Sequence, residues 1–230
     1  MVGVTTGTKP LRADAARNRD RLLAAASDLF AERGLDAPLE EIARRAGVSI
    51  GTLYNHFPTR DALFDAIMPT RIAVLHTGAE QALAEPNAWT GFVAFTETLF
   101  ALHAEDRGLN DALAQRVPLS PGIVEACHRT FRYIERLIVR AKEDGQLRED
   151  FEAADYATLI WAMSQVIRES TGVAPLAWRR TLAYFLDGLR AGAAHPLPAP
   201  ALTPKQLTAI MAAPPNGESR TQTAASSRTG

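Results

Sequence analysis

The sequence predicts an all-α protein, because helical periodicity is the only regular pattern along its 230 residues. No run of residues alternates apolar and polar side chains in the way that marks a half-buried β-strand, and no segment is repeated. Glycine, proline and hydroxyl residues divide the helical pattern into short helices near the N-terminus and longer helices behind them. This length is enough for one helical domain of ordinary size and a small second module.

The first predicted helix runs from about Ala15 to Arg33. Its apolar stripe has the spacing i, i+4, i+7 and i+8 and consists of Leu22, Ala26, Leu29 and Phe30. Gly34 follows at the position where a helix commonly ends on a left-handed residue. We expect residues 1–14, which precede this helix, to form a flexible arm.

Two shorter helices are predicted next. Pro38 is typical of a first helical turn, and Gly47 ends the pattern that it opens. The inner face of this second helix is apolar at helical spacing: Leu39, Ile42, Ala43 and Ala46. Ser49 is the predicted N-cap of a third helix, Ile50 to Phe57, which Pro58 closes.

The rest of the chain reads as a helical body with a proline-rich end. Thr59 is the predicted N-cap of a fourth helix, in which Pro69 should cause a kink or a break. Five further helices are expected at about 87–104, 108–115, 121–143, 152–171 and 176–193. Six prolines follow within twenty residues of one another, so a short helix from Thr203 through Met211 is the only element expected there, and 212–230 should be disordered.

These elements divide the chain into four parts. The expected parts are a flexible N-terminal arm (1–14), a small helical module (15–68), a helical body (69–195) and a Pro-rich, disordered tail (196–230).

The segment from Leu39 to Phe57 fits the geometry of a helix-turn-helix. A glycine permits the tight turn at position 47, and Ala43 is small where two helices must cross closely. The outer face of the third helix is narrow and offers donors, acceptors and a methyl group, as a helix in a DNA major groove requires. Its residues are Gly51, Thr52, Tyr54, Asn55 and His56. A purely structural helical hairpin with a polar outer face is the alternative.

Residues 15–68 resemble the DNA-binding domain of the TetR family of transcriptional regulators. The stretches LFAERG, IARRAGVS, GTLYNHF and TRDALF all occur in register. The resemblance implies an N-terminal three-helix helix-turn-helix domain, a C-terminal helical domain for ligand binding and dimerisation, and double-stranded operator DNA as partner. It also implies that Gly51, Thr52, Tyr54, Asn55 and His56 lie on the recognition helix, and that Arg60 touches the DNA backbone.

Two departures from the family pattern concern the DNA contacts. Ala37-Pro38 replaces hydroxyl residues that often precede the second helix, so a phosphate contact should be missing there. Ile50 stands where many members have a polar or basic residue, so an apolar contact should replace a polar one.

Charge alone does not indicate a nucleic-acid partner, since the net charge is −1 and the nine basic residues before position 66 balance nine acidic ones. Four arginines do cluster around the start of the first helix, at positions 12, 17, 19 and 21, where a solvated helix start is an equal alternative. The N-terminus lacks the pattern of a signal peptide, no stretch is long enough to span a membrane, and Cys127 is the only cysteine. We expect a cytoplasmic protein with no membrane partner.

A polar stripe on the penultimate long helix is the candidate wall of an effector pocket. It consists of Trp161, Gln165 and Arg168 at i, i+4 and i+7, and a solvated or interface edge is the alternative. The expected effector is an apolar or amphipathic small molecule, with an anionic group if Arg168 binds it. The histidines and Cys127 show no ligand spacing or nucleophile–base pair, so no metal, cofactor or catalytic residue is expected.

The two last long helices are expected to form a homodimer interface. One of them carries an apolar stripe of Tyr156, Ile160, Met163 and Ile167, and the other carries Trp178, Leu182, Phe185 and Leu189. The favoured function is a dimeric repressor that a small molecule releases from a pseudo-palindromic operator. The alternatives are a DNA-binding regulator without an effector and, more remotely, an enzyme on a helical bundle.

Overall fold

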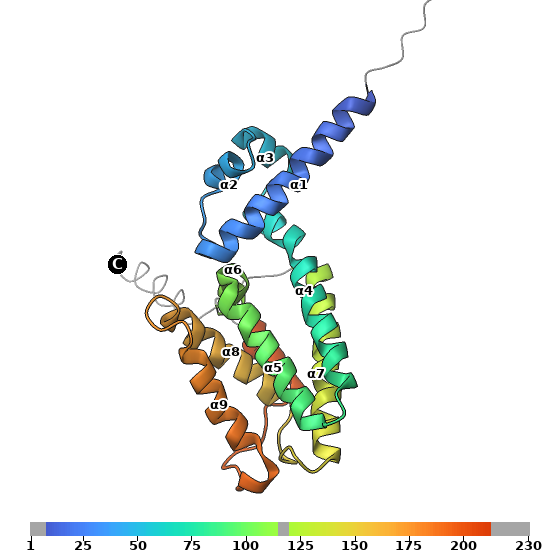
Figure 1. Ribbon diagram of the computed structural model, residues 1–230, viewed down its shortest axis with the longest axis vertical. Coiled ribbons are helices and arrows are strands. Elements are labelled where there is room, and N and C mark those ends of the chain that lie inside the picture. The colour runs from blue at the N-terminus through green and yellow to red at the C-terminus, as the bar shows by residue number, and fades with distance from the viewer. Residues whose placement is uncertain (1–7, 115–119, 213–230) are drawn as a thin grey trace, which may run out of the picture.

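A computed structural model describes residues 8–114 and 120–212, and within these ranges it is built of helices without a β-strand (Figure 1). The helices are α1 (Thr8–Arg33), α2 (Leu39–Arg45), α3 (Ile50–His56), α4 (Arg60–Ala84), α5 (Ala88–Glu105), α6 (Arg107–Ala114), α7 (Pro121–Glu143), α8 (Ala153–Ser170), α9 (Ala177–Leu189) and α10 (Pro204–Ala212). A single 3₁₀ turn, Ala191–Ala193, follows α9. The predicted all-α fold is confirmed, and no helix in these ranges is long and apolar enough to cross a bilayer.

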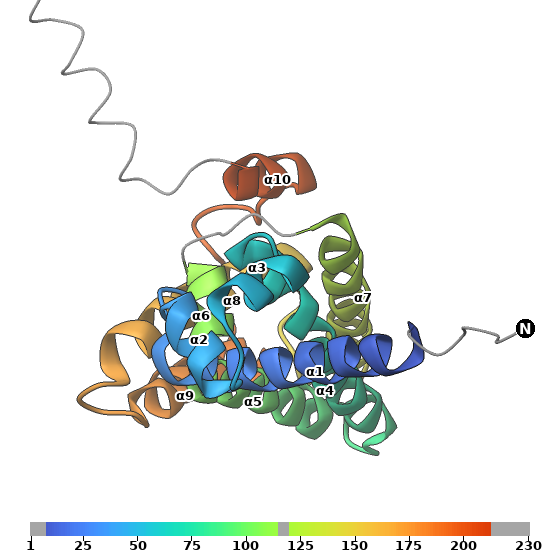
Figure 2. The same cartoon turned by 90° about the horizontal axis from the view of Figure 1, so that it is seen from above.

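The first three helices and the start of α4 form a small head with its own core. Figure 2 shows α2 and α3 lying to one side of the long α1. Six side chains of this core have no exposed surface: Leu22, Ala26, Phe30, Ile42, Leu53 and Leu63. Because they come from all four helices, the head holds its short helices together by shared burial rather than by their own stability.

The body has a second core, which α4, α5, α7, α8 and α9 surround (Figure 1). Its largest fully buried side chains are aromatic: Phe92, Phe95, Phe100 and Tyr156. The Tyr156 hydroxyl has a partner in the Thr96 hydroxyl at 3.1 Å, which offsets the cost of burying it. Burial raises the pKa of this phenol above its ordinary value, so the hydroxyl keeps its proton.

The first helix begins at Thr8, earlier than the predicted start at about Ala15, so residues 8–14, expected as part of the N-terminal arm, are helical. Pro10 lies in the first turn, where a helix tolerates proline because the N–H groups of this turn have no acceptor within the helix. The next residues are mostly good helix formers, such as leucine, arginine and alanine. This stretch carries no apolar stripe, which is why periodicity did not reveal it.

Pro69 does not break the fourth helix, which runs without interruption from Arg60 to Ala84. The proline ring is exposed to solvent, and the opposite side of α4 packs against α5 and α7. Packing on both halves of the helix therefore holds it together across the lost hydrogen bond.

Hydroxyl caps hold the starts of three helices, α3, α4 and α10. The hydroxyls of Ser49, Thr59 and Thr203 accept hydrogen bonds from the backbone N–H three residues later, at 3.0 to 3.3 Å. In α10 the side chain of Gln206 also accepts from the N–H of Thr203, which completes a capping box. The disorder predicted for 212–230 concerns residues outside the described ranges, except Ala212, which ends α10.

Candidate nucleic-acid interface

The turn between α2 and α3 has the tight geometry that the sequence predicts. Gly47 has a φ of +67°, a backbone conformation that side-chain-bearing residues rarely adopt. Its N–H donates to the Arg44 carbonyl at 3.1 Å, and the Val48 N–H donates to the Ala43 carbonyl at 3.0 Å. Ala43 is almost fully buried, so the small side chain lets the two helices approach each other.

The third helix is fixed at its start and along its inner face. The Ser49 hydroxyl accepts from the Thr52 N–H at 3.1 Å and lies 2.9 Å from the Thr52 hydroxyl. Leu53 is completely buried, and Val48 and Ile50 pack partly against the head core. These contacts leave the opposite face of α3 turned away from the protein.

The structure brings three of the predicted DNA-binding residues together on that outward face. Gly51 and Asn55 are exposed, and Tyr54 is 46% exposed, although a large aromatic residue is normally more buried. Thr52 and His56 lie beside this face and are half-buried. The Thr52 hydroxyl already shares a hydrogen bond with the Ser49 hydroxyl. Of the five residues, Gly51, Tyr54 and Asn55 are therefore the most accessible to a partner.

Ile50 and the start of α2 bear on the two departures noted in the sequence. Ile50 is half-buried against the head core, so part of its side chain serves packing. Pro38 is the N-cap residue of α2 and makes no side-chain hydrogen bond, while Ala37 is buried. Neither residue offers a hydroxyl to a phosphate.

Arg60 has a structural role that the sequence did not indicate. Its Nη1 donates to the carbonyls of Leu35 and Ala37, which lie in the loop between α1 and α2. The guanidinium therefore ties the start of α4 to this loop. Its remaining N–H groups leave room for the predicted contact with the DNA backbone, which stays a prediction.

Arginines of α1 lie next to the recognition element, although the sequence analysis did not include them among the DNA-binding residues. Arg19 stacks over the ring of Phe57, with 5.4 Å between its Cζ and the ring centroid. Arg21 reaches the turn, because its Nη1 would lie 3.5 Å from a side chain at Gly47. Both arginines are exposed, and the cluster of four arginines was the signal that could have identified them.

The head is joined to the body by buried contacts of α6 as well as by the continuous α4. Arg71 of α4 forms a buried ion pair with Asp106 and donates to the Ser27 carbonyl of α1 at 3.3 Å. A side chain at Gly108 would stand 2.9 Å from Phe30 Cβ, which means that α6 and α1 are in close contact. The head and α6 thus share a close packed contact.

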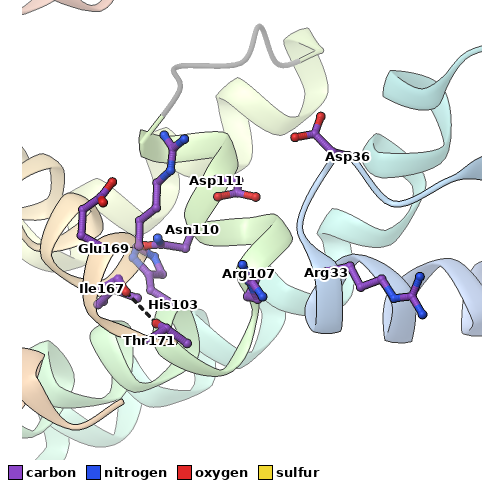
Figure 3. Close-up of a pocket in the computed structure, with 10 residues that line it drawn as sticks. Arg33, Asp36, His103, Arg107, Asn110, Asp111, Ile167, Glu169 and Thr171 are labelled. Atoms are coloured by element: carbon purple, nitrogen blue, oxygen red, sulfur yellow. Dashed lines mark hydrogen bonds between the residues drawn. The ribbon is translucent and has the colours of Figure 1, made fainter. Parts of the chain in front are cut away.

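The three residues of the predicted effector wall do not line one cavity. Arg168 borders a polar cavity of about 350 Å³ between α1, α6 and α8, whereas Trp161 and Gln165 are not among its lining residues (Figure 3). The Gln165 side chain donates to the Ala114 carbonyl at 3.1 Å, and Trp161 is half-buried. Among the described residues that line this cavity, only Ile167 is aliphatic, so they do not form the apolar wall expected for an apolar effector.

The two stripes predicted for a dimer interface mostly face the core of their own chain. Trp178, Leu182 and Leu189 are buried in the body, and so are Tyr156, Met163 and Ile167. These stripes are therefore no evidence for an interface, because the body core needs their side chains. The homodimer itself stays a prediction. What α9 leaves in solvent is Phe185, which is 41% exposed, and Tyr184, which is 64% exposed.

The comparisons with known proteins agree with this architecture. The family model "Bacterial regulatory proteins, tetR family" matches residues 22–67, and the model "Transcriptional regulator SbtR-like, C-terminal domain" matches residues 85–191. A TetR transcription regulatory protein from Mycobacterium vanbaalenii, known from a crystal structure, is 35% identical. That match covers 79% of this chain and 99% of the other, with a TM-score of 0.49.

Two further relatives are more distant. The HTH-type transcriptional regulator SrpR of Pseudomonas putida is 28% identical over 142 residues, which are 59% of this chain and 66% of SrpR. The crystal structure of the transcriptional regulator FadR from Bacillus subtilis, in complex with stearoyl-CoA, is 14% identical. It shares the fold, with a TM-score of 0.54 over 76% of this chain and 99% of FadR. Because one TetR family model matches the head and a second, C-terminal regulator model matches most of the body, the chain belongs to the TetR family of transcriptional regulators.

Proposed function

We propose that this regulator acts as a homodimer that binds a pseudo-palindromic operator through one α3 per subunit, and that a small molecule releases it. The observation that carries the proposal is the outward face of α3. Gly51, Tyr54 and Asn55 are exposed there, on a helix that Leu53 anchors in the head. A close-approaching glycine, an amide that can pair with a base edge and a phenol within reach of a phosphate suit a major groove.

Backbone contacts in this proposal come from the arginines around α3. Arg19 and Arg21 lie beside Phe57 and Gly47, at the two ends of the recognition helix, and Arg60 opens α4 close by. The net charge of the head does not favour DNA, so these local guanidinium groups have to supply the attraction to phosphates. Arg17 is occupied by an ion pair with Asp14 and is a weaker candidate.

A dimer follows from how little DNA one α3 can read. This helix has seven residues, and a single short recognition helix contacts too few base pairs for useful specificity. Tyr184 and Phe185 are adjacent exposed aromatic residues on α9, which a second subunit would cover. The Arg180 side chain donates to the Tyr184 hydroxyl at 2.7 Å, so the ring is held in place on this surface.

Release by a small molecule is the part of the proposal that depends most on the family. FadR of the same fold binds stearoyl-CoA in its crystal structure. In this chain, α4 and α6 both connect the body to the head, so a ligand that shifts either helix would move α3. A DNA-binding regulator without an effector is the second candidate, and the tightly packed aromatic core of the body favours it.

The experiment that tests the proposal is selection of bound duplexes from fragmented genomic DNA, followed by footprinting. We expect an inverted repeat whose half-sites are separated by about one helical turn or a multiple of it. Failure to enrich any sequence over random duplex would refute operator binding. Thermal-shift screening followed by binding assays on the selected operator then separates the two candidates.

A further inference from the structure

A polar cavity lies at the junction of head and body, and both parts contribute residues to its wall. Figure 3 shows residues of α1 and its following loop on one side and residues of α5, α6 and α8 on the other. The lining residues are Arg33, Asp36, His103, Arg107, Asn110, Asp111, Ile167, Arg168, Glu169 and Thr171. Its volume of about 350 Å³ lies at the lower end of the range for small-molecule pockets.

Two buried residues form the inner wall of the cavity and lack hydrogen-bond partners. His103 and Asn110 are each only 2% exposed. Within the described part of the chain, His103 Nδ1 and Asn110 Oδ1 have no partner, although the Asn110 amide nitrogen donates to the Ser164 carbonyl at 3.0 Å. A buried polar atom without a partner is costly, so both positions call for a polar group from outside the protein.

The rim of the cavity carries both signs of charge in equal number. Its charged residues are Arg33, Arg107, Arg168, Asp36, Asp111 and Glu169. Among the described residues, Arg107, Arg168, Asp36 and Glu169 make no hydrogen bond or ion pair, although the charges of Arg168 and Arg107 act on the nearby Asp111 carboxylate. Because two of these four groups are positive and two are negative, together they attract no ion strongly. They do offer hydrogen-bond donors and acceptors next to each other.

The inner wall selects a hydroxyl group over a charged group. Asn110 Oδ1 only accepts hydrogen bonds, so a carboxylate cannot satisfy it. Burial lowers the pKa of His103 to about 4, so its ring is neutral near pH 7, and no carboxylate among the inner residues would balance an ammonium group. A hydroxyl can donate to Asn110 Oδ1 and also serve His103 Nδ1 in either tautomer.

We propose that this cavity binds an uncharged, polyhydroxylated small molecule of about monosaccharide size. One hydroxyl lies between His103 and Asn110, and the others meet the guanidinium and carboxylate groups of the rim. A ligand in this position touches both the head and the body. Its affinity therefore depends on how the two are arranged, and operator binding and ligand binding must change each other's affinity by the same factor. This last step rests on the proposed operator function, whereas the binding site does not.

Isothermal titration calorimetry on the full chain without DNA tests the site. The probes are aldohexoses, hexitols and cyclitols, and the comparison probes are glycine, citrate and decanoate. We expect saturable binding of at least one polyhydroxylated probe. His103→Phe removes Nδ1 but keeps an aromatic ring at this position, and Arg168→Ala removes an exposed rim group without changing the core. Each variant should weaken binding by about tenfold or more. Arg136→Ala, an exposed arginine of α7 outside the cavity, is the matched control and should leave binding unchanged.

Three results would overturn the proposal. The first is no heat of binding with any polyhydroxylated probe at about 10 mM, because a specific site should bind with a Kd below this concentration. The second is binding that both cavity variants leave unchanged, and the third is stronger binding of glycine, citrate or decanoate. Operator affinity with and without the bound probe tests the coupling separately. An unchanged operator affinity would refute the coupling while the calorimetric site stands, and the lack of any operator would refute the proposed function alone.

Discussion

At the scale of single residues, Tyr54 is the sharpest test of the recognition surface, because it is exposed and supports no core contact. We expect Tyr54→Ala to weaken binding to the selected operator by about 1–3 kcal/mol, the usual size of one specific contact. Fluorescence anisotropy measures this, and the melting temperature should not change. Tyr54→Phe separates the roles of hydroxyl and ring. An operator affinity that is the same in the wild type and in Tyr54→Ala would place recognition elsewhere.

Arg60 should behave differently, since its guanidinium holds the carbonyls of Leu35 and Ala37. We expect Arg60→Ala to lower the free energy of unfolding by about 1–3 kcal/mol, the range for hydrogen bonds from a charged donor. If Arg60 also touches phosphate, the variant will bind all duplexes more weakly and with a smaller salt dependence. Urea denaturation and salt-dependent binding measure the two effects independently, and unchanged stability would contradict the structural role.

His103 predicts a pH effect on stability. Its pKa is lowered to about 4 in the folded chain because burial disfavours the charged ring, whereas the unfolded value is near 6.5. The unfolded state therefore binds more protons between these values, so stability is full above about pH 6.5 and falls as the pH drops towards 4. The loss should approach about 3 kcal/mol, and His103→Phe should lack this part of it. Parallel acid-induced losses in the two proteins would refute this assignment.

Residue-level prediction from the sequence worked where the partner is close in the chain and failed where it is not. The caps at Ser49 and Thr59 bond three residues ahead, and both were predicted. Arg60 bonds to carbonyls 23 and 25 residues earlier, and the Asp111 carboxylate accepts from the Leu35 N–H, 76 residues away. Sequence spacing carries no information on such contacts, because the fold alone brings them together.

At the scale of helices, the contact between α1 and α6 is the clearest to test. A side chain at Gly108 would stand 2.9 Å from Phe30 Cβ and 3.1 Å from the Phe30 carbonyl oxygen. We expect Gly108→Ala to destabilise the protein by about 1–3 kcal/mol, because the two helices must separate. Gly122→Ala is the matched control, since nothing lies within 4 Å of a side chain there and alanine favours a helix. Equal stability of both variants, measured by thermal unfolding, would contradict the close contact.

The sequence predicted the boundaries of the long helices well, but not the surface against which each apolar face packs. The ranges of α5, α7 and α8 differ from expectation by one residue or less at each end, because caps and glycines mark them. The apolar stripe of α9 was assigned to a partner subunit, although Trp178 and Leu182 are in the body core. An apolar stripe indicates burial but not against which surface, so a sequence cannot separate an interface from a core.

At the scale of the whole molecule, two connections join the head to the body. Helix α4 is continuous across Pro69, and Gly108 of α6 packs closely against Phe30 of α1. Arg71 of α4 also forms an ion pair with Asp106, which precedes α6, and donates to the Ser27 carbonyl of α1. Both partners of this pair are buried, so removing one would leave an unpaired charge. The head is therefore held to the body through α6 as well as through α4.

The proposed dimer depends on the exposed aromatic pair of α9. Phe185→Arg places a charge at the centre of this surface, and in a dimer it would be buried without a partner. We expect light scattering to show a monomer for this variant and a dimer for the wild type at micromolar concentration, as few contacts survive an unpaired interfacial charge.

The control for this variant is Val139→Arg, because Val139 is exposed on α7, away from α9, and its change should leave the dimer intact. The monomer should also lose most of its operator affinity although α3 is untouched, because a second recognition helix is no longer held at a fixed distance. A wild-type monomer would refute the dimer, and a dimeric Phe185→Arg would move the interface to another surface. Full operator affinity in a monomeric variant would show instead that one α3, with the arginines of α1, is sufficient for recognition.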